Sequence, residues 1–367
     1  MKVLQVAHYY GSPGGIERVV SQFCACLKQE YEVEVLVANE GAKTEETIED
    51  GVRVTRVGRV AHINRMSICP TFPSWLKKKN PDLVHLHLIN PLAELSYLVS
   101  NLRCKAIATY HMDITRQLWM KPIHQPMLDR VLNKLDRITV SSQRFAENSP
   151  VLSRYMDKIH ILPFGISEER FKATPFNRSL TEEFKKQYAG KLVLFVGRLT
   201  HYKGLSVLVE AMKKVDATCV IIGTGYLRET IKEQIKEEGL EDRVHLIGHA
   251  SDEELAAYYD RADVFVLPSI NRTESFGITQ LEAMSRGTPV VCTEVGTGTT
   301  TINRHEETGL VVPPQDPEML SQAINRILSD EALAHKLSKG AVERYKTYYS
   351  EAVMWQNLRS LYSELLA

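Results

Sequence analysis

Short, unbroken apolar runs alternate with amphipathic segments along most of this chain, and the pattern occurs twice. In the first half, apolar runs lie at 3–7, 32–37, 82–87, 106–110 and 137–140, and an amphipathic segment lies at 15–28. In the second half, apolar runs lie at 192–196, 218–222, 244–247, 264–267 and 289–292, separated by helical segments at 204–213, 226–238, 252–261 and 279–286. Continuous Val, Ile and Leu runs are typical of parallel strands buried on both faces. The alternation predicts an α/β chain with two doubly wound, Rossmann-like domains.

The junction between the two domains is expected near 162–177, where Pro163, Gly165 and Pro175 interrupt the periodicity. We therefore expect an N-terminal domain at 1–170 and a C-terminal domain at 171–348, which suits a length of 367 residues. The apolar residues of 351–366 have helical spacing. A C-terminal helix at 349–367 is expected to cross back and dock on the N-terminal domain.

Charge and cysteine content exclude several classes of protein. Basic and acidic residues both number 45, so a strongly basic nucleic-acid-binding protein is not expected. The balance is uneven, because residues 1–170 carry 22 basic and 18 acidic side chains and the remainder carry 23 and 27. The six cysteines lack CxxC or zinc-ligand spacing, which favours reduced thiols in the cytoplasm. Neither a signal peptide nor a membrane-spanning run is apparent, so we expect a cytoplasmic protein.

Two glycine pairs follow predicted strands and precede predicted helices. Gly14 and Gly15 open the first helix, where backbone N–H groups can approach an anion without an obstructing Cβ. Gly223 and Gly225 begin a dinucleotide-like fingerprint, but Arg228 stands where its third glycine belongs. A dehydrogenase is therefore disfavoured. Close backbone contact with a nucleotide and a plain tight turn remain alternatives for each pair.

The segment FVGRLTHYKG places two cations in one loop after a buried strand. Gly197 permits a tight turn, and Arg198 and Lys203 could converge on a diphosphate. The planar guanidinium of arginine donates two parallel hydrogen bonds, and the ammonium of lysine is a compact charge. The alternative is that both are solvated loop residues.

Two glutamates flank the start of a predicted helix in the segment SINRTESFGITQLEAM. Glu274 lies in the loop and Glu282 lies eight residues further on, inside the helix. Phe276 and Gly277 fall at the helix N-terminus, where free N–H groups attract phosphate or sugar oxygens. Each carboxylate could accept hydrogen bonds from polyol hydroxyls. The alternative is a capping glutamate and a surface glutamate.

Taken together, the spaced glutamates, the FVGR…KG segment and the Gly-Gly-x-Glu segment near the N-terminus resemble the retaining GT-B glycosyltransferases of family 4, over nearly the whole chain. The resemblance implies two Rossmann-like domains facing a cleft, with a nucleotide sugar held mostly by the C-terminal domain and the acceptor by the N-terminal one. It implies that Glu274 lies at the donor sugar and that Glu282 holds the ribose. It also implies diphosphate binding by Arg198 and Lys203.

The same resemblance assigns backbone roles. Gly14 and Gly15 would face the phosphates, and Ser275, Phe276 and Gly277 would present backbone to the sugar and phosphate. Family members often carry a histidine near the donor sugar after an N-domain strand, which matches His111 in ATYHMD. A structural, hydrogen-bonded histidine is the alternative. The string DLVHLH, which ends in His87, also resembles a family element.

The chemistry that the resemblance implies needs neither a protein base nor a metal. The leaving diphosphate can take the acceptor's proton while the acceptor enters on the same face of the sugar. Arg198 and Lys203 would stabilise the charge that builds on the diphosphate. The sequence contains no Asp-x-Asp motif, so we expect neither a metal nor a cofactor besides the donor.

Residues 51–81 contain seven cations and no acidic residue. The cations are Arg53, Arg56, Arg59, Arg65, Lys77, Lys78 and Lys79. Phe72, Trp75 and Leu76 interleave with the lysines, so the Arg53–Lys79 region could contact an anionic membrane peripherally, as could 118–121. The alternative is a helix whose apolar side chains face the core. Nucleic acid is not expected as a partner.

The strings at 111–117 and 296–300 most resemble bacterial mannosyltransferases that build surface polysaccharide from GDP-mannose. We therefore expect transfer of a hexose to a saccharide or a lipid-linked saccharide. A UDP-hexose or UDP-N-acetylhexosamine donor, a sugar-nucleotide epimerase of the same fold, and a non-catalytic binding protein are the alternatives.

Overall fold

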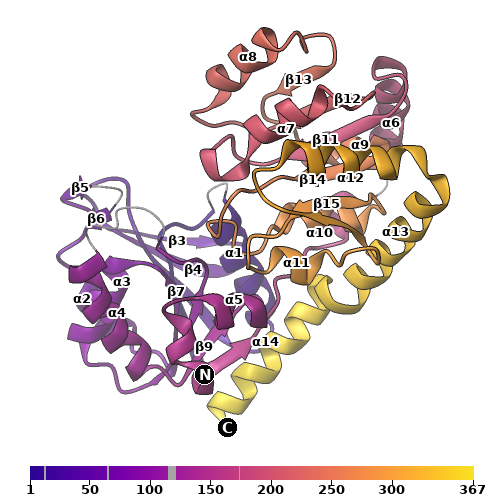
Figure 1. Cartoon of the computed structure of the whole chain (residues 1–367). Helices are drawn as coiled ribbons and strands as arrows, with labels where there is room; N and C mark the ends of the chain where they lie inside the picture. Colours follow the sequence, from indigo (N-terminus) through magenta and orange to yellow (C-terminus); the bar gives the residue numbers. More distant parts are fainter. Residues whose placement is uncertain (12–13, 64–65, 115–120, 173) are drawn as a thin grey trace. The chain divides into compact units, whose positions relative to one another are not determined.

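A computed structural model describes residues 1–11, 14–63, 66–114, 121–172 and 174–367. The chain forms two compact units (Figure 1). Unit 1 comprises Met1–Leu162 together with Trp355–Ala367, and unit 2 comprises Pro163–Met354. The division falls after Leu162, a few residues before the expected position 170. It also assigns most of the last helix to the first unit.

Unit 1 contains, among its described residues, an eight-stranded sheet in the order β10-β9-β8-β7-β1-β2-β4-β3. All neighbours pair in parallel except β3 and β4. The strands are β1 (Lys2–Val6), β2 (Glu32–Ala38), β3 (Glu45–Glu49), β4 (Val52–Val57), β7 (Leu83–Leu88), β8 (Lys105–Tyr110), β9 (Arg137–Val140) and β10 (Ile159–Ile161). A separate hairpin joins β5 (Ala61–Ile63) and β6 (Met66–Ile68). The order of connection reverses between β1 and β7, and ligands of open α/β sheets bind at such reversals.

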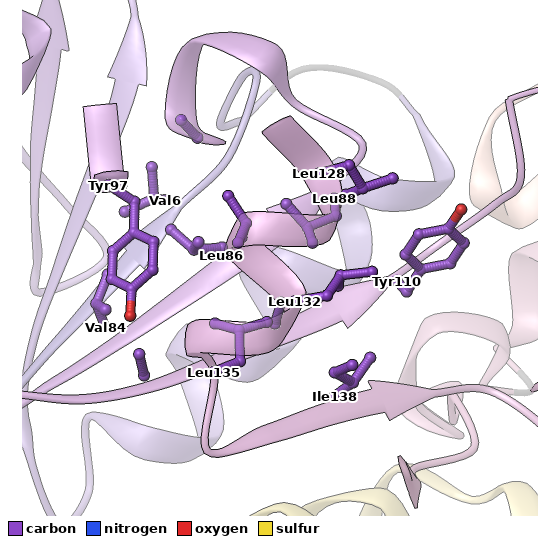
Figure 2. Packing of buried hydrophobic residues seen from close by; sticks show 14 of the residues in the cluster. Val6, Val84, Leu86, Leu88, Tyr97, Tyr110, Leu128, Leu132, Leu135 and Ile138 are labelled. Atoms are coloured by element: carbon purple, nitrogen blue, oxygen red, sulfur yellow. The ribbon is translucent and has the colours of Figure 1, made fainter. Parts of the chain in front are cut away.

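Helices cover both faces of this sheet. They are α1 (Gly15–Leu27), α2 (Phe72–Lys79), α3 (Pro91–Ser100), α4 (Lys121–Lys134), α5 (Gln143–Asn148) and most of α14 (Glu351–Leu366). Figure 2 shows one face, on which Leu128, Leu132 and Leu135 of the α4 region pack over strand residues such as Leu86 and Ile138. Because side chains alternate along a strand, every second residue of β1, β7, β8 and β9 belongs to this apolar core.

Unit 2 has, within the described residues, a six-stranded, fully parallel sheet in the order β13-β12-β11-β14-β15-β16. The strands are β11 (Leu192–Val196), β12 (Thr218–Ile222), β13 (Val244–Ile247), β14 (Val264–Leu267), β15 (Val290–Thr293) and β16 (Gly309–Val312). The helices are α6 (Pro175–Gln187), α7 (Leu205–Met212), α8 (Arg228–Glu237), α9 (Asp252–Arg261), α10 (Ile278–Ser285), α11 (Thr299–Ile302), α12 (Pro317–Ser329) and α13 (Glu331–Arg344). Numbered along the unit, the strand order is the 3-2-1-4-5-6 of Rossmann folds, with its reversal between β11 and β14.

Four helices of unit 2 start at a side-chain cap that the sequence places just ahead of them; they are α6, α9, α12 and α13. Ser251 and Glu254 form a reciprocal capping box at α9, and Asp316 accepts a hydrogen bond from Met319 at the start of α12. These bonds satisfy N–H groups that the first turn of a helix leaves without partners.

The basic segment of unit 1 is less accessible than its sequence suggests. Phe72 and Leu76 are fully buried in the core, so the prediction that they contact a membrane is wrong. The Lys79 ammonium is also buried, 2.8 Å from carboxylate oxygens of both Glu34 and Glu46. The amphipathic pattern of α2 serves the core, and only Lys77 and Lys78 of this helix present exposed charge.

No helix among the described residues has the length and apolarity needed to cross a membrane. All six cysteines are free thiols, and five of them are buried. Every cysteine except Cys104 is thus buried, and the reduced state expected from the sequence stays a prediction.

Candidate active site

The loops that follow β11 and β14 lie against each other where the strand order of unit 2 reverses. Gly204 has a positive φ of 69°, and a Cβ there would stand 1.9 Å from the Pro268 carbonyl oxygen. The Ile270 N–H donates to the Tyr202 carbonyl across the same junction at 2.9 Å. Only glycine permits this approach. Gly204 was not among the predicted site residues, although its position directly after Lys203 was a usable signal.

The two loops bring Lys203 and Glu274 into a buried ion pair. The Lys203 Nζ lies 2.5 Å from Glu274 Oε2, and both side chains are about nine-tenths buried. The Ser269 hydroxyl donates to the same carboxylate oxygen at 3.1 Å. Burial alone would lower the pKa of Lys203, but the Glu274 charge outweighs it, so the net pKa of Lys203 lies above its ordinary value. Lys203 is therefore a fixed cation at neutral pH.

Arg198 supplies a second, more accessible cation beside the pair. Its side chain is exposed, and its charge opposes the protonation of Lys203, which places the two cations near each other. Lys203 is neutralised by Glu274 whereas Arg198 is solvated. The convergence of the two cations on a diphosphate stays a prediction. The arrangement offers an incoming anion one solvated charge and one charge partly balanced by a carboxylate.

The loop that carries Glu274 is fixed by the threonine-rich segment at 296–300. The Thr297 hydroxyl donates to the Glu274 carbonyl at 2.6 Å, and the Gly298 N–H donates to the Ser275 carbonyl at 2.9 Å. Thr297 is fully buried. The segment GTGTT, singled out in the sequence for its resemblance, thus positions the backbone of Glu274 and Ser275.

Gly277 and Phe276 set the start of α10. Gly277 has φ +84°, a conformation that favours glycine, and a Cβ there would stand 2.8 Å from the Leu267 side chain. Phe276 is buried and packs edge-to-face on Phe164 and Tyr349, with ring centroids 5.3 and 6.1 Å apart. The Phe276 side chain is therefore an anchor, which leaves only its backbone to serve a ligand.

The glycines after β11 and β12 pack against one another's loops. A Cβ on Gly223 would lie 1.9 Å from the Gly197 carbonyl oxygen, and one on Gly225 would lie 2.3 Å from the Leu199 carbonyl oxygen. Loop packing thus accounts for Gly223 and Gly225 without a nucleotide. Their contact with a donor stays a prediction, as does that of Gly197.

Three buried hydroxyls at this edge of the sheet lack partners among the residues that the structure describes. They are the Oγ1 atoms of Thr200, Thr279 and Thr300, in the segments after β11, β14 and β15. These strands are neighbours in the sheet. A buried polar group without a hydrogen bond costs about 1–3 kcal/mol, so the edge suits a ligand rich in hydroxyl or phosphate oxygens. None of the three was named as a site residue from the sequence, although Thr300 ends the GTGTT segment.

Glu282 makes its described contacts away from the Lys203–Glu274 pair. One carboxylate oxygen accepts from the Arg170 guanidinium, and the other accepts from the Tyr259 hydroxyl at 2.8 Å. Arg170 is also bonded to Asp252 at the start of α9. Glu282 is almost fully buried, and its carboxylate already joins α9 and α10. A ribose bound by Glu282, as predicted, would have to use the same carboxylate.

In unit 1, the predicted residues follow the strands at the reversal. Gly14 precedes α1, and its missing Cβ makes room for the Glu17 carboxylate, which would otherwise stand 2.0 Å away. Gly15 is the first residue of α1. His111 follows β8, is buried, and bonds His87 through Nε2 at 2.9 Å. Burial and then the charge of His8 lower the pKa of His111 to about 3, so the ring is neutral at neutral pH.

Two sequence predictions extend beyond the described residues. Residues 115–117 of the mannosyltransferase-like string and 118–120 of the second basic-apolar segment lie outside them, as does Arg65. Within the described ranges, no cluster of three or more His, Cys, Asp or Glu side chains is arranged to hold a metal. Metal independence itself stays a prediction.

Family models match both units. Residues 178–344 match the model described as glycosyl transferases group 1, and residues 13–170 match the model described as glycosyltransferase family 4. The chain is 32% identical over 269 residues to the D-rhamnosyltransferase WbpZ of Pseudomonas aeruginosa, covering 73% of this chain and 70% of that relative. It is 27% identical over 377 residues to the O-antigen chain mannosyltransferase C of Escherichia coli, covering 100% and 99%.

Among solved structures, sucrose-phosphate synthase from Thermosynechococcus elongatus superposes with a TM-score of 0.81 at 24% identity, covering 99% of this chain and 98% of that one. The two Rossmann-like units and the cationic strand edge in unit 2 define a glycosyltransferase of the GT-B fold. The chain belongs to glycosyltransferase family 4, and its C-terminal half is a group 1 glycosyl transferase domain.

Proposed function

We propose that this glycosyltransferase is a retaining, metal-independent hexosyltransferase whose unit 2 holds the nucleotide diphosphate at the β11/β14 edge. The observation that carries the proposal is the Lys203–Glu274 pair with Arg198 beside it, fixed at the reversal of a Rossmann-type sheet. A cation held in place before the reaction stabilises a developing diphosphate charge without reorganising.

The site residues then divide the work. Arg198 and Lys203 bind the diphosphate and oppose the charge that grows on it as the bond to the sugar breaks. The diphosphate oxygen takes the proton of the attacking acceptor hydroxyl, which enters on the face that the diphosphate leaves. Glu274 accepts hydrogen bonds from hydroxyls of the donor sugar, and its loop is fixed by Thr297. His111 contacts the donor sugar, and Glu282 contacts the ribose.

Mannose from GDP-mannose is the donor group that we propose. Two relatives are named for transfer of mannose and of D-rhamnose. D-Rhamnose is 6-deoxymannose, so both names describe sugars of the same ring configuration. The match to the mannosyltransferase extends over the whole of this chain.

We further propose that the product is a bacterial surface polysaccharide such as an O-antigen, because one relative is named for that polymer. The acceptor would be a saccharide or a lipid-linked saccharide. A cytoplasmic enzyme that meets a lipid-linked acceptor would touch the membrane peripherally, and Lys77 and Lys78 are the exposed cations of α2 that could do so.

The test is a panel of sugar nucleotides, incubated with the full chain with and without lipid-linked oligosaccharide. Transfer, hydrolysis and epimerisation of the donor are each scored by mass spectrometry and chromatography. We expect transfer from GDP-mannose with retention of the anomeric configuration, unaffected by EDTA. Transfer from UDP-hexoses alone would overturn the donor assignment. Epimerised donor without any transfer would overturn the proposal as a whole.

A further inference from the structure

A line of buried polar side chains crosses four neighbouring strands of unit 1. The residues face away from the apolar core of Figure 2, because they occupy the alternate strand positions. They are Gln5 on β1, His85 and His87 on β7, Thr109 on β8 and Thr139 on β9, and all are essentially inaccessible to solvent. His111 continues the line just after β8. On the opposite face of these four strands, the described residues of the core are apolar.

Hydrogen bonds join these side chains end to end through a tyrosine of α14. His111 Nε2 lies 2.9 Å from His87 Nδ1, and His87 Nε2 lies 2.9 Å from Gln5 Oε1. The Gln5 amide nitrogen donates to the Tyr362 hydroxyl at 2.9 Å. That hydroxyl lies 2.6 Å from His85 Nδ1.

The far half of the line consists of hydroxyls. His85 Nε2 lies 2.7 Å from the Thr109 hydroxyl, which lies 2.7 Å from the Thr139 hydroxyl. The Thr139 hydroxyl donates to the backbone carbonyl of Ala108 at 3.3 Å. A carbonyl oxygen cannot donate, so it fixes this end of the line as an acceptor.

The histidines in the line each carry one ring proton. Burial, followed by the charges of neighbouring histidines, lowers the pKa of His85 to about 3, and burial likewise lowers the pKa of His87. The same holds for His111, with His8 as the neighbour. A neutral imidazole has one donor nitrogen and one acceptor nitrogen. If one nitrogen of a ring donates to its neighbour, the other nitrogen must therefore accept from the next neighbour.

The direction follows from the two fixed orientations. The Gln5 amide oxygen accepts from His87 Nε2, so His87 Nδ1 has no proton and must accept from His111. At the other end, Thr139 donates to the Ala108 carbonyl, so Thr109 donates to Thr139 and accepts from His85. Both ends require the same direction of donation: each group donates to the next one along the line from His111 to the Ala108 carbonyl.

We propose that Gln5 and Tyr362 are positioning residues that hold His111 as its Nε2–H tautomer, so that His111 Nδ1 is a hydrogen-bond acceptor. Its use rests on the function proposed above: the ring would accept a hydrogen bond from a hydroxyl of the donor sugar. It would not donate to a phosphate oxygen. The polar line thus makes the character of one ring nitrogen depend on a tyrosine of α14.

The direct test is nitrogen-15 NMR of the histidine rings in the full chain without any sugar nucleotide. A His111→Gln variant identifies the His111 resonances among those of the 12 histidines. We expect a pyrrole-type Nε2 and a pyridine-type Nδ1 for His111 at neutral pH. The reverse pattern, or two pyrrole-type nitrogens, would overturn the proposal.

A matched pair of substitutions at the far end tests the direction. In Thr139→Val, the Thr109 hydroxyl loses its acceptor and is left to donate to His85 Nε2, so that His85 Nδ1 donates to Tyr362. We expect Tyr362 then to donate to a turned-over Gln5 amide, which reverses the line and makes His111 the Nδ1–H tautomer. Thr139→Ser keeps the hydroxyl and should keep the parental pattern. A folded Thr139→Val variant with unchanged His111 resonances would contradict the proposal.

Tyr362→Phe interrupts the line in the middle. We expect a mixture of His111 tautomers in this variant, whereas Tyr31→Phe should leave the pattern unchanged. Tyr31 is the matched control because its ring packs on Tyr362, with centroids 6.0 Å apart. An identical response of both variants would show that packing, not the hydroxyl, sets the tautomer, and would overturn the role of Tyr362.

These spectra are independent of the donor panel, so the two proposals can fail separately. If transfer is observed, Thr139→Val should raise the KM for the donor at least several-fold, and Thr139→Ser should not. A changed His111 spectrum in Thr139→Val with an unchanged KM for the donor would count against the sugar-binding role of His111 and leave the tautomer assignment standing.

Discussion

At the residue level, the decisive feature is that Lys203 is balanced by Glu274 within unit 2. The sequence could nominate both residues, because each belongs to a motif of the family that it resembles. It could not show that they are each other's partner, since they are 71 positions apart and joined only by the contact between two loops. Lys203 and Glu274 are thus a single buried ion pair with little net charge.

Lys203→Ala should lower kcat by about 10²- to 10³-fold, the usual loss when one fixed charge-stabilising group is removed. The variant also leaves Glu274 buried without a counter-charge, which should lower the free energy of unfolding by about 3–5 kcal/mol. Steady-state kinetics and urea denaturation measure the two effects. Unchanged turnover in a folded variant would remove Lys203 from the mechanism.

Two further variants separate chemistry from folding at this pair. Lys203→Ala combined with Glu274→Gln removes both charges, so it should recover stability without recovering activity. Arg198→Ala should lower kcat while leaving the unfolding free energy nearly unchanged, because the Arg198 side chain is exposed. Recovery of turnover in the double variant would show that Lys203 has only a structural role.

At the element level, the sequence predicts what hydrophobic periodicity can register. The central strands were found close to their observed bounds, and α14 was found almost residue for residue. The edge strand β3 was missed because its residues EETIE are mostly exposed and carry no apolar signal. The opposite error occurred at α2, where an apolar stripe interpreted as membrane-facing is buried in the core. Hydrophobic periodicity predicts which side of a helix is apolar, but it does not predict whether that side packs on the core or on another surface.

The start of α10 gives a prediction about one glycine. Gly277→Ala should destabilise unit 2 by about 2–4 kcal/mol, because it adds positive-φ strain of about 1–2 kcal/mol to a clash with buried side chains. Gly190→Ala is the matched control, since its φ of +83° is nearly the same but a Cβ there meets nothing within 4 Å. Chemical denaturation compares the two. Equal losses would mean that the Leu267 contact is unimportant.

The exposed lysines of α2 give a second prediction at this level. Changing Lys77 and Lys78 together to Glu should weaken co-sedimentation with anionic liposomes, because each cation near such a surface contributes about 1 kcal/mol. Lys185 and Lys186 are the control, since they form a similar exposed pair at the end of α6. If both double variants sediment like the parent, the membrane contact is refuted.

At the level of the whole molecule, the two units repeat one sheet design with different interiors. Unit 1 encloses the polar line of histidines and hydroxyls, whereas every residue of β11, β14 and β15 in unit 2 is buried and almost all are apolar. The sequence predicted the repetition, because both halves have the same alternation. It did not predict the polar line, which requires knowing the strand register that places Gln5 beside His85.

The buried histidines predict a pH dependence of stability. His85 and His111 have pKa values near 3 in the folded state against 6.5 when unfolded, so unfolding takes up protons. Stability is therefore complete above pH 6.5 and is lost as the pH falls, by about 2 kcal/mol per histidine at pH 5. Tryptophan fluorescence follows unit 1, because none of the three tryptophans lies in 163–354. Urea midpoints that do not change between pH 7 and pH 5 would contradict this.

The composition of unit 1 has a consequence for how the protein is made. Unit 1 includes the helical segment Trp355–Ala367, which a ribosome reaches only after synthesising all of Pro163–Met354. At about 5–20 residues per second, the strands of unit 1 wait roughly 10–40 s for the helix that carries Tyr362. During that interval Gln5 and His85 lack the hydroxyl that joins them. The speed of translation therefore sets how long Gln5 and His85 remain without this hydrogen-bond partner.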